Sequence, residues 1–100
     1  MSEKTTVIIP AYKPGKELLP TIEGLIDIGF RDILVVDDGG GEAFAPIFQQ
    51  VEAIPYCTVL RHEVNRGKGA ALKTAFAYFL EHRPDSLGVV TADADGQHRQ

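Results

Sequence analysis

The chain has 100 residues, a hydrophobic share of 44% and a net charge of −4. This size suits one hydrophobic core, and the composition is that of a globular protein rather than a disordered or membrane-spanning one. The acidic balance argues against a nucleic-acid partner, which would need clustered Lys and Arg. The single cysteine, Cys57, cannot form an internal disulfide. Because Cys57 adjoins an apolar run, we interpret it as a small buried hydrophobic residue.

No signal peptide opens the sequence, and no apolar run approaches the roughly 20 residues that cross a bilayer. We therefore expect a cytoplasmic chain, with membrane contact at the inner face only through regions outside these residues or through a lipid-linked ligand. The sequence ends directly after a dense polar motif and without a further helical pattern. This ending indicates that residues 1–100 are one part of a longer domain, truncated at the C-terminus.

Two hydrophobic periodicities alternate along the chain. Short β-branched and apolar runs predict strands at 6–9, 33–36, 58–60 and 87–91. Helical spacing predicts helices at 17–28, 42–51 and 68–82. The apolar stripe of the last helix comprises Leu72, Phe76, Phe79 and Leu80. The alternation of strand and helix predicts a Rossmann-like α/β fold, a mostly parallel sheet with helices on both faces.

Polar residues concentrate in the segments that follow the predicted strands. These segments are 10–13, 37–40, 62–68 and 93–98. In open parallel sheets, ligands bind beyond the carboxyl ends of the strands, so we expect one ligand site at this edge.

The segment after the last predicted strand carries two carboxylates at an i, i+2 spacing, Asp93 and Asp95. In extended chain such residues point the same way, and they repel each other unless a cation lies between them. Gln97 adds a third oxygen two positions further on. An all-oxygen set suits Mn²⁺ or Mg²⁺ bound together with a diphosphate. The alternative interpretation is a solvated acidic turn.

Two other strand-end segments have the chemistry of a nucleotide site. The carboxylates of Asp37 and Asp38 are suited to accept hydrogen bonds from a base or a ribose, and the alternative is a turn before the next helix. Arg66 and Lys68 lie where a helix N-terminus presents its N–H groups, which suits a phosphate. The alternative there is a glycine turn with solvated charges. Tyr12 fits two functions equally, stacking on a base or closing the edge of the core.

The three histidines, His62, His82 and His98, do not have metal-ligand spacing. We expect His82 to be an exposed residue at a helix end. His98 follows the acidic motif and stays without an assigned function.

Four segments, in the same order and spacing, resemble the successive motifs of glycosyltransferase family 2, which includes the dolichyl- and polyprenyl-phosphate sugar synthases. The segments are 7–12, 35–39, 65–72 and 93–98. The resemblance implies a GT-A fold, in which a Rossmann-like nucleotide-binding half is continued by an acceptor half.

The resemblance also implies functions for individual residues. Pro10, Ala11 and Tyr12 would line the nucleoside pocket, and Asp38 would meet the base. The family usually has Ser where this chain has Gly40.

In the acidic motif, the resemblance places Asp93 against the ribose or the metal, Asp95 on the metal and Gln97 beside it. The family's catalytic base is a later carboxylate, which has no counterpart within these residues.

Together these features predict an inverting, metal-dependent glycosyltransferase that uses a UDP- or GDP-sugar, with a polyprenyl phosphate or a saccharide as acceptor. We expect the chain alone to bind nucleotide weakly and to transfer no sugar, because an acceptor half is missing. We also expect it to self-associate, because its apolar strands lack an edge neighbour that a full enzyme would supply.

Two alternatives remain open at this stage. The apolar run ending in Asp37 and Asp38 resembles the opening of a phosphoacceptor receiver domain, although a receiver carries this motif on its first strand. A sugar nucleotidylyltransferase shares the fold, but it normally has a glycine-rich loop after its first strand, where this chain has 10–13.

Overall fold

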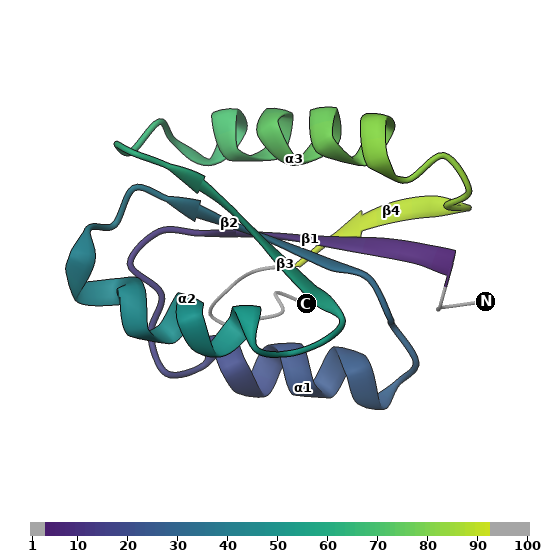
Figure 1. Ribbon diagram of the computed structural model, residues 1–100, viewed down its shortest axis with the longest axis horizontal. Helices are drawn as coiled ribbons and strands as arrows, with labels where there is room; N and C mark the ends of the chain where they lie inside the picture. Colours follow the sequence, from purple (N-terminus) through teal and green to yellow (C-terminus); the bar gives the residue numbers. More distant parts are fainter. Residues whose placement is uncertain (1–3, 93–100) are drawn as a thin grey trace, which may run out of the picture.

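Four parallel strands form the sheet of the computed structural model, which describes residues 4–92 (Figure 1). The strands are β1 (Thr5–Ala11), β2 (Ile33–Asp38), β3 (Cys57–His62) and β4 (Gly88–Thr91). The helices are α1 (Leu18–Asp27), the 3-10 helix η2 (Glu42–Phe44), α2 (Ala45–Glu52) and α3 (Lys68–His82). Strands and helices alternate as the two periodicities predict. In this part of the chain, no helix combines the length and apolarity needed to span a membrane.

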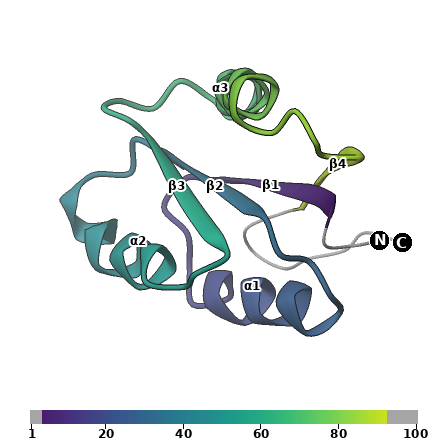
Figure 2. The same ribbon diagram turned by 45° about the vertical axis from the view of Figure 1, so that its right-hand side comes forward.

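The strand order is β3-β2-β1-β4, and all neighbouring strands are parallel. The chain steps from β1 to β2 to β3 in one direction and then returns past β1 to β4. Right-handed crossovers place the connecting helices on one face during the first two steps and on the other face during the return. Accordingly, α1 and α2 cover one face and α3 covers the other (Figures 1 and 2). The predicted α/β fold with helices on both faces of a parallel sheet is confirmed.

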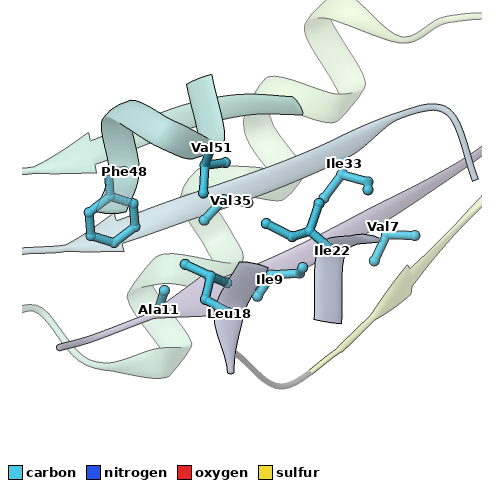
Figure 3. Packing of buried hydrophobic residues seen from close by; sticks show 9 residues of the cluster. All are labelled: Val7, Ile9, Ala11, Leu18, Ile22, Ile33, Val35, Phe48 and Val51. Atoms are coloured by element: carbon cyan, nitrogen blue, oxygen red, sulfur yellow. The ribbon is translucent and has the colours of Figure 1, made fainter. Parts of the chain in front are cut away.

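Alternation along the strands divides the core into two clusters. On β1, Val7 and Ile9 pack toward α1 and α2, whereas Ile8 packs toward α3. The larger cluster is shown in Figure 3 and comprises Val7, Ile9, Ala11, Leu18, Ile22, Ile33, Val35, Phe48 and Val51. The central strand β2 is buried along its whole length. Both β1 and β2 are therefore fixed by packing on two sides up to their carboxyl ends.

Small residues bring α3 close to the sheet. Ala71 and Ala75, one helical turn apart, are its fully buried residues. The predicted apolar stripe is wrong at two positions, because Phe76 is 38% exposed and Leu80 is 75% exposed. The other two residues of the stripe, Leu72 and Phe79, are partly buried and pack against the second cluster of the core. The alanines therefore face the sheet directly, and the larger side chains lie at the margin of the cluster or outside it.

The helix predicted at 42–51 is divided into η2 and α2. Pro46 lies in the first turn of α2, where its missing N–H has no intrahelical acceptor to lose. A continuous α-helix from Glu42 would bring the Pro46 ring against the carbonyl four residues earlier. The proline therefore sets where α2 begins.

A hydrogen-bonded cluster closes the amino edge of the sheet, opposite the predicted site. The Oδ2 atom of Asp32 accepts hydrogen bonds from Thr6 Oγ1 at 2.6 Å and Arg83 Nε at 2.7 Å. These contacts join β1, the start of β2 and the residue that follows α3. Because the cluster fixes the far end of α3, it helps to keep the helix in place over the sheet.

Cys57 provides a test of this packing. It is partly buried against the larger cluster. Burial and the negative charge of Asp32 raise the pKa of its thiol from 9.0 to about 11. Because the thiolate is the nucleophile, we expect iodoacetamide at pH 8 to label folded protein roughly a hundredfold more slowly than protein unfolded in urea. Mass spectrometry over a time course measures both rates. Equal rates would contradict the buried position of this thiol.

Candidate functional site

A cavity of about 580 Å³ lies at the carboxyl edge of the sheet, where the predicted strand-end segments meet. This volume is within the range of small-molecule sites. Its lining comes from the end of β1 and the loop after it, from the last residue of β2 and from the turn that starts α3. The lining residues are Pro10, Ala11, Tyr12, Lys13, Pro14, Gly15, Asp38, Asn65, Gly67 and Lys68. Three of the four predicted segments therefore contribute to one site.

Asp38 holds two of these segments together. Its Oδ1 atom accepts hydrogen bonds from His62 Nδ1 at 2.8 Å and from the backbone N–H of Arg66 at 3.0 Å. Its Oδ2 atom accepts from Asn65 Nδ2 and from the backbone N–H of Gly67, both at 3.0 Å. The Asp38 side chain is 3% exposed. The carboxylate is therefore a buried anchor for the turn that leads into α3.

The electrostatics of Asp38 follow from these contacts. Burial alone raises the pKa of a carboxyl group, but hydrogen bonds from His62, Arg66 and Gly67 stabilise the charged form and outweigh it. The pKa of Asp38 is therefore lower than its ordinary value of 3.8, and the group is a carboxylate at neutral pH. A carboxylate offers about four acceptor positions, and donors of the chain itself reach all of them.

Two residues of the network around Asp38, His62 and Thr74, had no function assigned from the sequence, although His62 begins one of the predicted strand-end segments. His62 lies beside Asp38 in the register of β2 and β3, and its Nε2 atom is 2.7 Å from Thr74 Oγ1 on α3. The spacing argument considered His62 only as a metal ligand. The signal that identifies it is the parallel register, which places the last residues of two adjacent strands side by side.

Asp37 is buried like its neighbour but differs from it in orientation and in hydrogen bonding. Its side chain points to the opposite face of the sheet, and its Oδ1 atom is buried without a hydrogen-bond partner within residues 4–92. The two carboxylates, which the sequence treats as a pair, therefore belong to two different environments. Only Asp38 lines the cavity.

Tyr12 and Lys13 form one wall of the cavity. The Tyr12 side chain is 50% exposed, so it does not close the edge of the core. Lys13 Nζ lies 5.4 Å from the centre of the Tyr12 ring. An exposed aromatic face next to a cation suits a planar ligand that carries negative charge.

The first turn of α3 forms the opposite wall. Gly67 is the N-cap, and no side chain caps the helix. Backbone N–H groups at a helix N-terminus attract anions, and Lys68 adds a positive side chain to the lining. Arg66, which the sequence predicted as a nucleotide ligand, is exposed and does not line the cavity, although its backbone N–H is bound to Asp38.

The predicted metal ligands Asp93, Asp95 and Gln97 lie outside the described residues, as does His98. Between residues 4 and 92, no group of three or more His, Cys, Asp or Glu residues is arranged to hold a metal ion. The metal site stays a prediction from the sequence. His82 is exposed on the last turn of α3, as expected, and stacks on Tyr78 with ring centres 4.1 Å apart.

Comparison with known proteins identifies the class. The model of the family described as glycosyl transferase family 2 matches residues 6–100. The chain therefore belongs to glycosyltransferase family 2, and its parallel sheet with a pocket at the carboxyl edge is consistent with the Rossmann-like half of the GT-A fold.

The individual relatives are longer than this chain and share about a third of its residues in the matched region. An uncharacterized protein of Methanocaldococcus jannaschii is 37% identical over 92 residues, which cover 92% of this chain and 35% of the relative. A UDP-N-acetylglucosamine–dolichyl-phosphate N-acetylglucosaminyltransferase of Methanococcus voltae is 30% identical over 92% of this chain and 41% of its own length. A shorter match, 38% identical over 47% of the chain, is to a ribosome maturation factor of Deinococcus radiodurans. The chain thus spans less than half the length of these relatives.

The anchoring role of Asp38 predicts a difference between two isosteric substitutions. In Asp38→Asn, an amide NH₂ group would face donors, so we expect the free energy of unfolding to fall by roughly 2–4 kcal/mol. Asp37→Asn should stay within about 1 kcal/mol of wild type, because Oδ1 has no partner to lose. Urea unfolding followed by circular dichroism at pH 7 measures both.

The difference in unfolding free energy between wild type and Asp38→Asn should depend on pH in one direction. Because the pKa of Asp38 is lowered in the folded state, its contribution is present above the ordinary value of 3.8 and is lost as the pH falls below it. The gap between wild type and Asp38→Asn should therefore narrow below that pH. Equal stability of the two variants at pH 7 would contradict the anchoring role.

Gly39 lets the end of β2 approach the turn before α3. Its φ is +78°, and a Cβ atom there would lie 2.2 Å from the carbonyl carbon of Val64 and 2.3 Å from the nitrogen of Asn65. Gly41 is a matched control, because its φ is +92° but a Cβ atom would meet no heavy atom within 4 Å. The two glycines differ only in whether the backbone of a neighbouring loop is close.

We expect Gly39→Ala to cost about 1–3 kcal/mol more than Gly41→Ala, since both carry the positive-φ penalty and only the first forces the backbone apart. Thermal and urea unfolding of the two variants measure the difference. Equal losses would show that the approach of the two loops does not contribute to stability.

Proposed function

We propose that this chain is the nucleotide-sugar-binding part of a metal-dependent, inverting glycosyltransferase whose donor is a UDP- or GDP-sugar. The observation that supports the proposal is the cavity at the carboxyl edge, between an exposed aromatic wall and a helix N-terminus. Membership of glycosyltransferase family 2 supports the same reaction class. An exposed aromatic side chain suits the nucleoside end of a nucleoside diphosphate, and helix N–H groups with a positive side chain suit its diphosphate end.

In this proposal the nucleoside lies against Pro10, Ala11 and Tyr12, with Asp38 beneath it. The diphosphate lies toward the N-terminus of α3, where backbone N–H groups and Lys68 favour negative charge. Holding the donor in one geometry is the contribution that these residues make to transfer.

The proposed cofactor is Mn²⁺ or Mg²⁺, held by Asp93, Asp95 and Gln97. A divalent cation bound there would neutralise charge on the leaving diphosphate. Asp93 is also the residue expected beside the ribose. Oxygen ligands are the set that both cations prefer.

The proposed acceptor is a polyprenyl phosphate, with a saccharide as the second candidate. The relative from Methanococcus voltae carries a dolichyl phosphate in its name, which favours a lipid-linked phosphate. A phosphate acceptor is already ionised at neutral pH, so it needs no base. Such an acceptor would bring the full-length protein to the membrane surface.

The strand order argues against the receiver alternative. A receiver has the flavodoxin-like order 2-1-3-4-5, with the first strand between the second and the third. Here β2 lies between β1 and β3, and Asp38 is engaged in anchoring a turn. A nucleotidylyltransferase would share the sheet, but the lining loop after β1 has one glycine, Gly15, instead of a glycine-rich segment.

The proposal predicts that nucleotide and metal strengthen each other's binding. Calorimetric titration of UDP and GDP, with and without Mn²⁺, measures this coupling. For whichever nucleotide binds, we expect the affinity to rise roughly tenfold when Mn²⁺ is present. Asp95→Asn should remove the metal effect and leave the unfolding midpoint unchanged.

Glu81→Gln is a matched control, because it removes one carboxylate from an exposed position at the end of α3. It should retain the full metal effect. Equal nucleotide affinity with and without Mn²⁺ in the wild-type protein would refute the metal dependence, and it would leave nucleotide binding itself intact.

A further inference from the structure

His62 and Thr74 extend the hydrogen-bond network of Asp38 away from the cavity. His62 Nδ1 is 2.8 Å from Asp38 Oδ1, and His62 Nε2 is 2.7 Å from Thr74 Oγ1. The side chain of His62 is 6% exposed. Neither His62 nor Thr74 lines the cavity. These two residues therefore act on a ligand indirectly, and the hydrogen bond of His62 to Asp38 links them to a lining residue.

The donors and acceptors in this network can be assigned. A carboxylate only accepts hydrogen bonds, so the Nδ1 atom of His62 carries a proton and donates it to Asp38. If the second ring nitrogen, Nε2, carries no proton, it is an acceptor and the Thr74 hydroxyl donates to it. The network runs in one direction, from the hydroxyl on α3 through the imidazole on β3 to the carboxylate on β2.

We infer that His62 is a positioning residue of the nucleotide pocket, held by Thr74, and that it orients the Asp38 carboxylate on which the turn before α3 is built. The inference rests on the proposed function, since it assigns a residue to that pocket. It does not require His62 to touch the ligand.

Each carboxylate oxygen of Asp38 accepts two hydrogen bonds, and one of the two comes from the backbone of the turn. On Oδ1, the imidazole of His62 shares the atom with the N–H of Arg66. On Oδ2, the N–H of Gly67 is bound together with Asn65. The two backbone contacts shape the turn, whereas the imidazole is buried between two regular elements and cannot move with it. His62 therefore fixes the rotation of the carboxylate independently of the turn.

A fixed Asp38 carboxylate keeps the turn before α3 ordered in the absence of a ligand. When the turn is already ordered, a ligand does not have to order it, and the entropic cost of binding is smaller. Without His62, the carboxylate would keep its contacts with Asn65, Arg66 and Gly67, but all of them come from the turn itself. The turn and the carboxylate could then shift together, because no contact from a strand would hold the carboxylate in place. The backbone N–H groups in the first turn of α3 would then be held less firmly in the position that binds an anion.

The first experiment needs no ligand. Long-range ¹H–¹⁵N correlation spectra of the chain should show His62 protonated on Nδ1. Thr74→Val should shift the Nε2 resonance, and Thr74→Ser, which keeps the hydroxyl, should leave it near the wild-type position. Amide exchange at Arg66 and Gly67 should accelerate in His62→Leu relative to amides in β1. A His62 protonated only on Nε2, or unchanged exchange at both amides, would overturn the inference.

The second experiment measures UDP and GDP affinity by calorimetry. For the nucleotide that binds, His62→Leu should weaken binding roughly tenfold, as expected for one lost charge-assisted hydrogen bond. His62→Asn, which restores an N–H donor near the position of Nδ1, should recover most of the affinity. Val51→Ala, a cavity in the core on the opposite face, controls for stability and should bind as wild type does. Should His62→Leu fail to fold, Thr74→Val takes its place with a smaller loss.

The outcomes distinguish a failure of the proposed nucleotide binding from a failure of the positioning role of His62. Wild-type protein that binds neither nucleotide contradicts the proposed function, and the exchange experiment then decides the positioning role alone. Wild-type affinity in His62→Leu, or an equal loss in Val51→Ala, would overturn the positioning role while nucleotide binding stands.

Discussion

The buried carboxylate of Asp38 is the interaction on which the carboxyl edge of this protein depends. It ends the central strand and accepts hydrogen bonds from the end of β3 and from the turn that starts α3. Without an ionised acceptor at this position, several buried donors would have no partner. The price of burying one charge is offset by the donors that surround it, and the result is a fixed wall for the cavity.

The topology explains why a single residue can do this. β2 lies between β1 and β3, so its last residue is next to the loops that leave both neighbours. Alternation then assigns Asp37 to the face of α1 and α2 and Asp38 to the face of α3. Gly39 completes the arrangement, because the absence of a side chain lets the turn at Val64 and Asn65 approach the end of β2. The cavity is a product of packing between loops, and the rigid core holds those loops in place.

The sequence predicted the elements of the fold well because each strand and helix carries its own periodicity. It also predicted Asp38 and Lys68 as site residues, since both follow from the position of polar groups at strand ends. It could not predict the Asp38–His62–Thr74 network, because that network depends on the register of two strands and on the rotation of α3. The same rotation buries Ala71 and Ala75 and leaves Phe76 at the margin, which helical spacing alone does not decide.

The strand order also connects the cavity with the acidic motif that follows the described residues. The chain adds β2 and β3 on one side of β1 and then adds β4 on its other side, so the order of strands reverses between β1 and β4. Ligands of open α/β sheets bind at such a reversal. β4 lies beside β1, and the N–H of Ala92 donates to the carbonyl of Ile8 at 3.0 Å. The chain therefore enters the motif that begins at Asp93 from a position next to the strand whose end lines the cavity. The walls within residues 4–92 supply hydrogen-bond donors and positive charge, which suit a diphosphate but leave a cation without ligands. Under the proposed function, an acidic motif entered at this point would supply the oxygen ligands that the walls lack, and the cavity and the metal site would be complementary parts of one donor site.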